Sequence, residues 1–94
     1  MEARQEIDLL ESTHLFPGTY QIKAIGSAAD DFVGRVVSAA CEQVAAPSDV
    51  DYSLRTMKAG RHVGVTLNIA VQNPEQVLAL YARLRRVEGL AFLF

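Results

Sequence analysis

The strongest pattern in the chain is a strict alternation of apolar residues with polar or small ones from position 62 to position 71. An alternation with a period of two buries one face of a β-strand and leaves the other face more polar. No charged residue interrupts the run between positions 63 and 71, so it predicts a strand in the middle of a sheet, with helices over one face. Its buried face is expected to consist of Val63, Val65, Leu67, Ile69 and Val71.

Similar alternation predicts strands at residues 19–26 and 50–57, and the last five residues predict a short apolar strand. The strand at 50–57 is the more polar, which is typical of a sheet edge. Residues 58–61 are few enough for a hairpin loop, so the strands on either side of them are expected to be antiparallel neighbours.

Apolar residues spaced three and four positions apart predict two helices. The first begins where Ser27 or Asp30 can cap it and continues to about residue 44. The second has a clearer start, with Asn73 as cap, Pro74 at the first helical position and Gln76 placed to complete a capping box.

Two glycines are expected to have specific structural roles. Gly18 follows Pro17, and this pair predicts a type II turn in which Gly18 takes a positive φ. Gly34 lies inside the first helix, where glycine costs roughly 1 kcal/mol relative to alanine. We expect Gly34 to allow close contact with a neighbouring element.

The predicted order is β-α-β-β-α-β, the split βαβ arrangement of ferredoxin-like folds. The fold class is therefore α+β: a four-stranded antiparallel sheet with two helices on one face. Right-handed crossovers set the strand order as fourth, first, third, second. Residues 16–94 are expected to form this single domain, and residues 1–15 an N-terminal tail or short helix.

Composition indicates the cellular compartment in which the protein is expected. The chain has 94 residues, a net charge of −2 and one cysteine, Cys41, so it has no internal disulfide. The N-terminus lacks the features of a signal peptide, and no apolar run is long enough to span a membrane. These features predict a cytoplasmic protein without membrane attachment.

Residue types that carry catalysis or bind metals are scattered. His14, Cys41 and His62 share no metal-ligand spacing, and no base is evident that would activate Cys41 as a nucleophile. The sequence therefore predicts no catalytic residues, no metal site and no cofactor.

Two sets of residues are candidates for binding. Gly26, Ser27 and Asp30 lie between a strand and a helix, where free amides can receive the carboxylate or phosphate of a small ligand. The loop has two aspartates and no arginine, so plain turn chemistry is the competing interpretation. The second set is a basic patch around the hairpin: Arg55, Lys58, Arg61 and His62.

The basic patch raises the alternative of a nucleic-acid-binding module. RNA-recognition modules share this topology and stack bases on aromatic residues of their central strands. The strand at 62–71 has no aromatic residue, and the pI of about 5.6 is low for a nucleic-acid binder. Both observations argue against this alternative.

A family resemblance is carried by four stretches: Phe16-Pro17, residues 20–26, Leu67-Asn68-Ile69, and Glu75-Gln76-Val77 with Leu80-Tyr81. On these stretches, residues 15–94 resemble the YbeD family of small bacterial cytosolic proteins. This resemblance implies a free-standing relative of the ACT regulatory domain, and some members carry names that link them to lipoate and to regulation. It implies a non-catalytic regulatory or interaction domain that binds a small ligand or a protein partner.

The final strand predicts where a partner binds. Residues 90–94 carry no charged side chain and are expected at a sheet edge, and an uncovered apolar edge is a pairing site. ACT-like domains commonly pair side by side. We therefore expect a homodimer or a protein partner to cover this strand, or else the N-terminal tail to fold over it.

Overall fold

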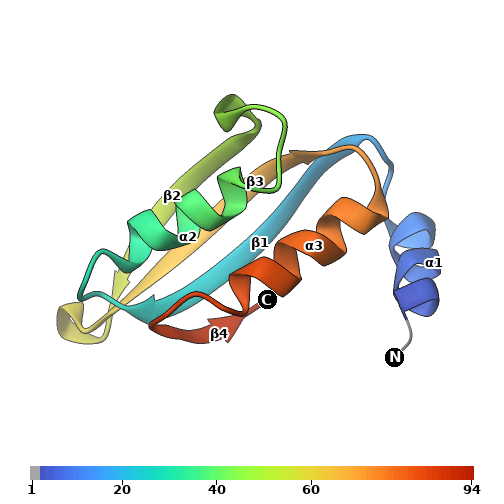
Figure 1. The fold of residues 1–94 in the computed structure, drawn as a ribbon. Coiled ribbons are helices and arrows are strands. Elements are labelled where there is room, and N and C mark those ends of the chain that lie inside the picture. Colours follow the sequence, from blue (N-terminus) through green and yellow to red (C-terminus); the bar gives the residue numbers. More distant parts are fainter. Residues whose placement is uncertain (1–2) are drawn as a thin grey trace.

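The computed structural model describes residues 3–94, apart from the side chain of Lys58. Two helices, α2 (Phe32–Cys41) and α3 (Pro74–Leu84), lie over one face of a four-stranded sheet (Figure 1). A further helix, α1 (Ala3–Thr13), stands beside the N-terminal end of α3. The predicted α+β, ferredoxin-like, ACT-like architecture is confirmed. No helix among the described residues is long and apolar enough to cross a membrane.

The strands are β1 (Gly18–Ser27), β2 (Val50–Met57), β3 (His62–Val71) and β4 (Leu90–Leu93). Two short 3-10 turns, η1 (Pro47–Asp49) and η2 (Lys58–Gly60), flank β2. The sheet order is β2-β3-β1-β4, and every neighbouring pair is antiparallel. This is the predicted order, so the right-handed crossover rule was sufficient to fix the topology.

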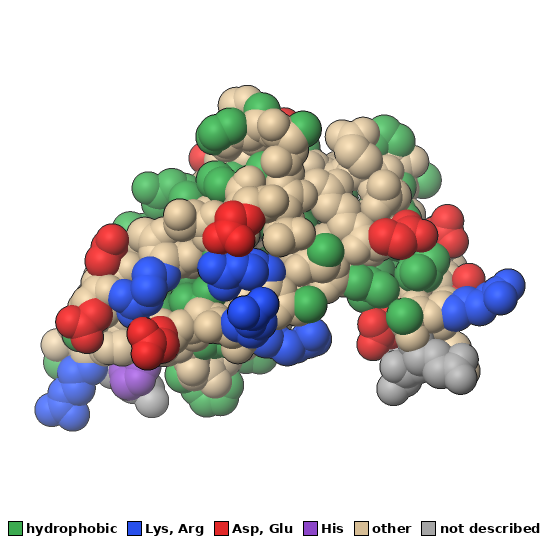
Figure 2. All heavy atoms as spheres, in the orientation of Figure 1, with side chains coloured by type: hydrophobic (Ala, Val, Ile, Leu, Met, Phe, Trp, Pro, Cys, Tyr) green, Lys and Arg blue, Asp and Glu red, His purple; other side chains and the backbone are tan. Residues whose placement is uncertain are grey.

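The core follows the alternation of β3. All five apolar residues predicted for its buried face are buried, and the intervening residues are partly exposed. Ile22 and Ala24 of β1 pair with Leu67 and Val65 and extend the same face. The helices close the core from above with Phe32, Val36, Ala39, Ala40, Val77, Leu80 and Leu84. Charged side chains lie on the outer surfaces of these helices (Figure 2).

The start of α2 differs from the prediction. Asp31 is the cap, not Ser27 or Asp30: its carboxylate accepts from the Gly34 amide at 3.2 Å. A side chain at Gly34 would collide with this carboxylate, so Gly34 makes room for its own helix cap and not for a neighbouring element. The helix also ends early, at Cys41 and not near residue 44.

Two other local predictions need correction. Gly18 has no positive φ, so the type II turn is wrong; a Cβ there would lie 2.6 Å from the Leu15 carbonyl oxygen, and this close approach is what requires glycine. Asn73 caps α3 as predicted, at 2.9 Å from the Gln76 amide. The Gln76 side chain, however, accepts from the Gln72 amide at 2.8 Å and not from the cap residue.

Candidate functional site

The loop that follows β1 uses its amides within the chain. The Ser27 amide donates to the Gly89 carbonyl at 3.0 Å, and the Ala28 amide donates to the Arg61 carbonyl at 3.0 Å. The Ala29 amide donates to the Ser27 hydroxyl at 3.2 Å. A ligand site at Gly26, Ser27 and Asp30 stays a prediction, and these internal bonds weigh against it.

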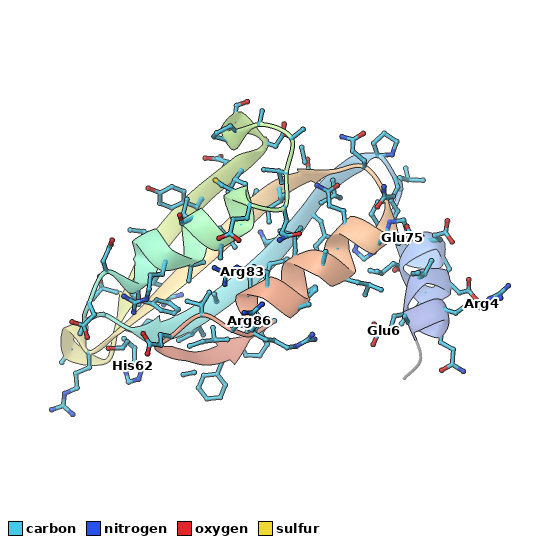
Figure 3. All side chains as sticks on the ribbon, viewed as in Figure 1. Arg4, Glu6, His62, Glu75, Arg83 and Arg86 are labelled. Carbon is cyan, nitrogen blue, oxygen red and sulfur yellow. The ribbon has the colours of Figure 1, made fainter. Side chains whose placement is uncertain are left out.

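The members of the basic patch come from β2, the hairpin turn and β3. His62 alternates with the buried positions of β3, and Arg55 of β2 pairs with Gly64 on the same side, so both lie on the sheet face that α2 and α3 leave uncovered. Arg61 is exposed in the turn before β3, and the side chain of Lys58 lies outside the described residues. His62 lies at the hairpin end of the sheet (Figure 3). Arg55 and His62 thus share a surface, and the basic patch as a whole stays a prediction.

We call the uncovered side of the sheet the open face. Strand register arranges its side chains in rows that cross the sheet. One row runs from Arg55 through Gly64 and Ile25 to Phe92. The next consists of Ser53, Thr66, Lys23 and Phe94. Neither row contains an acidic residue.

Phe92 and Phe94 are the aromatic residues of the open face. Their side chains are 59% and 63% exposed, and their rings stack with centroids 6.3 Å apart and planes 14° from parallel. Sequence analysis missed this pair because it tested only the central strand for aromatics. The two-residue spacing of the phenylalanines was the available signal, since alternate residues of a strand share a face.

A hollow of about 150 Å³ lies over Gly64. Lys23 and Arg55 stand on its two sides, with Ile25 and Met57 between them. Gly64 has no side chain to fill this hollow. A Cβ built there would lie 3.5 Å from the Met57 sulfur, which is an ordinary contact distance. The open face therefore offers stacked rings, a shallow apolar hollow and two positive charges.

The rings, hollow and charges of the open face are suited to binding.

The candidate metal ligands His14, Cys41 and His62 lie on different parts of the chain. His62 Nδ1 is enclosed with no hydrogen-bond partner among the described residues. Within the described part of the chain, no group of three or more His, Cys, Asp or Glu residues could hold a metal ion.

The outer edge of β4 adjoins the phenylalanines. Phe94 exchanges two backbone hydrogen bonds with Lys23 of β1, at 2.8 and 3.0 Å. In an antiparallel ladder the adjacent residue then directs its own amide and carbonyl away from that neighbour. The backbone of Leu93 therefore faces outward from the sheet.

A second hollow, of about 280 Å³, lies between α1 and α3 and is lined by apolar residues with Tyr20 and Tyr81, and by the charged residues Glu6 and Arg85. The two rings meet edge to face, and Arg85 lies 5.7 Å from the centre of the Tyr81 ring. Burial, followed by hydrogen bonding with Tyr20, raises the pKa of Tyr81. The Tyr81 hydroxyl therefore stays protonated at neutral pH.

A family model and several individual relatives match this chain. Residues 11–94 match a family described as "Protein of unknown function (DUF493)". The chain is 35% identical to a UPF0250 protein of Shewanella halifaxensis over 75 residues, which cover 80% of this chain and 83% of the relative. A UPF0250 protein of Shewanella piezotolerans matches equally well, and one of Shewanella sediminis is 32% identical over the same shares.

The family match covers the whole sheet with α2 and α3, and none of these relatives carries a name that states an activity. They confirm the resemblance drawn from the sequence. The chain belongs to the DUF493 (UPF0250, YbeD-like) family of small bacterial proteins.

Proposed function

We propose that this chain is a non-catalytic interaction domain that pairs through β4 with a second copy of itself. The observation that carries this proposal is the exposed pair Phe92 and Phe94 beside an uncharged edge strand. Exposed apolar edges are pairing sites unless charge or another element protects them. Regulation by a small ligand is one form that such a role can take.

The register of β4 makes it self-complementary. If Leu93 pairs antiparallel with Leu93 of a second copy, Phe92 lies opposite Phe94 of that copy. A shift of two residues brings Phe92 opposite Phe92 of the second copy instead. Because partners across a strand pair share a face, either register gathers four phenylalanine rings on the open face of one continuous eight-stranded sheet.

Sedimentation of the full chain at micromolar concentration tests this proposal. Phe92→Lys places a charge inside the proposed ring cluster, so we expect a dimer for the wild type and a monomer for the variant. The matched control is Leu54→Lys on β2, because Leu54 is 54% exposed but lies at the opposite edge of the sheet. A monomeric wild type, or equal dissociation of both variants, contradicts the proposal.

The open face also supports a second candidate, binding of single-stranded nucleic acid. Lys23 and Arg55 lie in the same two rows as the stacked phenylalanines, and bases stack on such rings while cations neutralise phosphates. Phe92 of β4 and Phe94 just after it supply the aromatic residues that the central strand lacks.

Titration of single-stranded RNA at low and moderate salt tests this second candidate. Binding constants fall as salt rises, and the slope of log K against log[salt] grows with each phosphate that the protein neutralises. Removing one cation that contacts a phosphate should reduce the size of this slope by about 0.7 for a single strand. We therefore expect Lys23→Gln to reduce the slope and Arg4→Gln, on α1, to leave it unchanged. Absence of binding at low salt removes the candidate.

A further inference from the structure

A groove between α2 and α3 lies on the opposite side of the sheet from the open face. It encloses about 420 Å³, and Arg35 and Ser38 line it from α2. Arg83 from α3 and Arg86 just beyond it line the other side, and the lining also includes Glu42, Val87 and Glu88. Figure 2 shows blue side chains with red ones among them around this part of the helix surface, and Figure 3 labels Arg83 and Arg86 there.

Arg83 is already neutralised. Its guanidinium donates two hydrogen bonds to the Glu42 carboxylate, at 3.0 and 3.1 Å. This hydrogen bonding from Arg83 holds the pKa of Glu42 below its usual value, and the nearby charge of Arg86 adds to the effect. The pair joins the C-terminal ends of α2 and α3 and forms one wall of the groove.

Within the described part of the chain, Arg35 and Arg86 are not held in ion pairs, although the carboxylates of Glu42 and Glu88 belong to residues that line the same groove. Arg35 Nη2 donates to the Glu88 carbonyl at 3.1 Å, and Arg35 Nε is enclosed with no partner among the described residues. The guanidinium of Arg35 is thus held in place by backbone, with donors left over.

The helix dipole explains only part of this cluster. Cations near the end of α3 are favoured by its carbonyl groups, which accounts for Arg83 and Arg86. Arg35 comes from the first half of α2 and reaches across to the connection before β4. Its position beside the other two arginines therefore needs a different reason.

We propose that this groove binds a small phosphate-bearing anion between Arg35 and Arg86. A guanidinium group presents several N–H donors in one plane, and this geometry matches the oxygens of a phosphate. Arg35, Arg86 and the Ser38 hydroxyl together offer more donors than a single carboxylate could accept. The volume lies within the range of small-molecule sites. This inference is independent of pairing through β4.

Thermal unfolding of the full chain tests the site with inorganic pyrophosphate, against sodium chloride of equal ionic strength. A ligand that binds the folded state raises the midpoint with saturation. We expect this rise for pyrophosphate and none for chloride. A parallel titration with AMP shows whether the site takes a phosphate carried by a nucleoside or only the free inorganic anion.

Variants locate the site. Arg86→Gln removes an exposed side chain and should weaken pyrophosphate binding by about tenfold, as expected for lost charged hydrogen bonds. Arg35→Gln should act in the same direction. The matched control is Arg85→Gln, one residue away, because Arg85 lies against the Tyr81 ring outside the groove.

Calorimetric titration of pyrophosphate into the wild type and into Arg86→Gln compares their affinities directly. This comparison locates the site even if Arg35→Gln fails to fold. Saturable binding that Arg86→Gln weakens and Arg85→Gln preserves supports the site. No midpoint rise with either phosphate probe overturns the inference, and so does equal weakening by Arg85→Gln and Arg86→Gln, since that result indicates a general charge effect.

Discussion

At Gly26 a single missing side chain lets three parts of the fold meet. A Cβ there would lie 2.5 Å from the Gly89 carbonyl oxygen and 2.5 Å from Cζ of the Phe32 ring. Both contacts are far too short, and Phe32 is among the largest fully buried side chains. Gly26 therefore serves packing between β1, α2 and the connection to β4, and this role accounts for it without a ligand.

Gly26→Ala should destabilise the protein by about 1 to 3 kcal/mol, the usual cost of an overpacked core. Gly64→Ala is the control, because its added Cβ would make only ordinary contacts of 3.5 to 4.0 Å. We expect Gly64→Ala to be close to neutral. Urea titration measures the free energy of unfolding of both variants. If Gly26→Ala loses as little stability as Gly64→Ala, the Phe32 ring moves aside easily.

The alternation of β3 makes a second prediction for single residues. Leu67 is fully buried, so Leu67→Ala should cost about 2 to 5 kcal/mol through lost transfer energy and a cavity. Thr66 lies on the open face, and Thr66→Ala should cost about 1 kcal/mol or less. Chemical denaturation compares the two, and similar losses would mean that the register is wrong.

Among the elements, α1 is the least integrated. It has no fully buried residue, and Leu10 is the residue of this helix that packs partly against the core. The hollow lined by Tyr20 and Tyr81 lies between it and α3. The division into a tail of residues 1–15 and a domain of residues 16–94 stays a prediction, with α1 as a helix docked on that domain.

Deleting residues 1–12 should lower the thermal midpoint by only a few degrees, because a segment with little burial contributes little stability. Calorimetry of the shortened chain measures this change. A loss of cooperative unfolding would show instead that Ile7 and Leu10 hold the core together.

The elements that sequence reasoning placed best have a strong period or a clear cap. The alternation in β3 and the sequence Asn73-Pro74 needed only local rules. The all-apolar run of β4 has no polar residue to mark its outer face, so the exposed side of Phe92 became visible only through pairing with β1. Asp30 and Asp31 are equivalent as caps in sequence, and only the backbone decides between them.

At the scale of the whole molecule, the two surfaces differ in chemistry. The helix side carries paired and unpaired charges, including the groove between Arg35 and Arg86. The open face carries Phe92 and Phe94 beside the bare edge of β4. Neither surface could be assigned from the sequence, because strand register and helix packing bring their residues together from distant positions.

Amide hydrogen exchange at Leu93 tests pairing through β4 most directly. The Leu93 amide faces outward, so it should exchange slowly at high protein concentration, where a second copy accepts its hydrogen bond, and quickly on dilution. Phe92→Lys should make exchange fast at both concentrations. Fast exchange in the concentrated wild type would contradict the account, and slow exchange at every dilution would show that the chain covers its own edge.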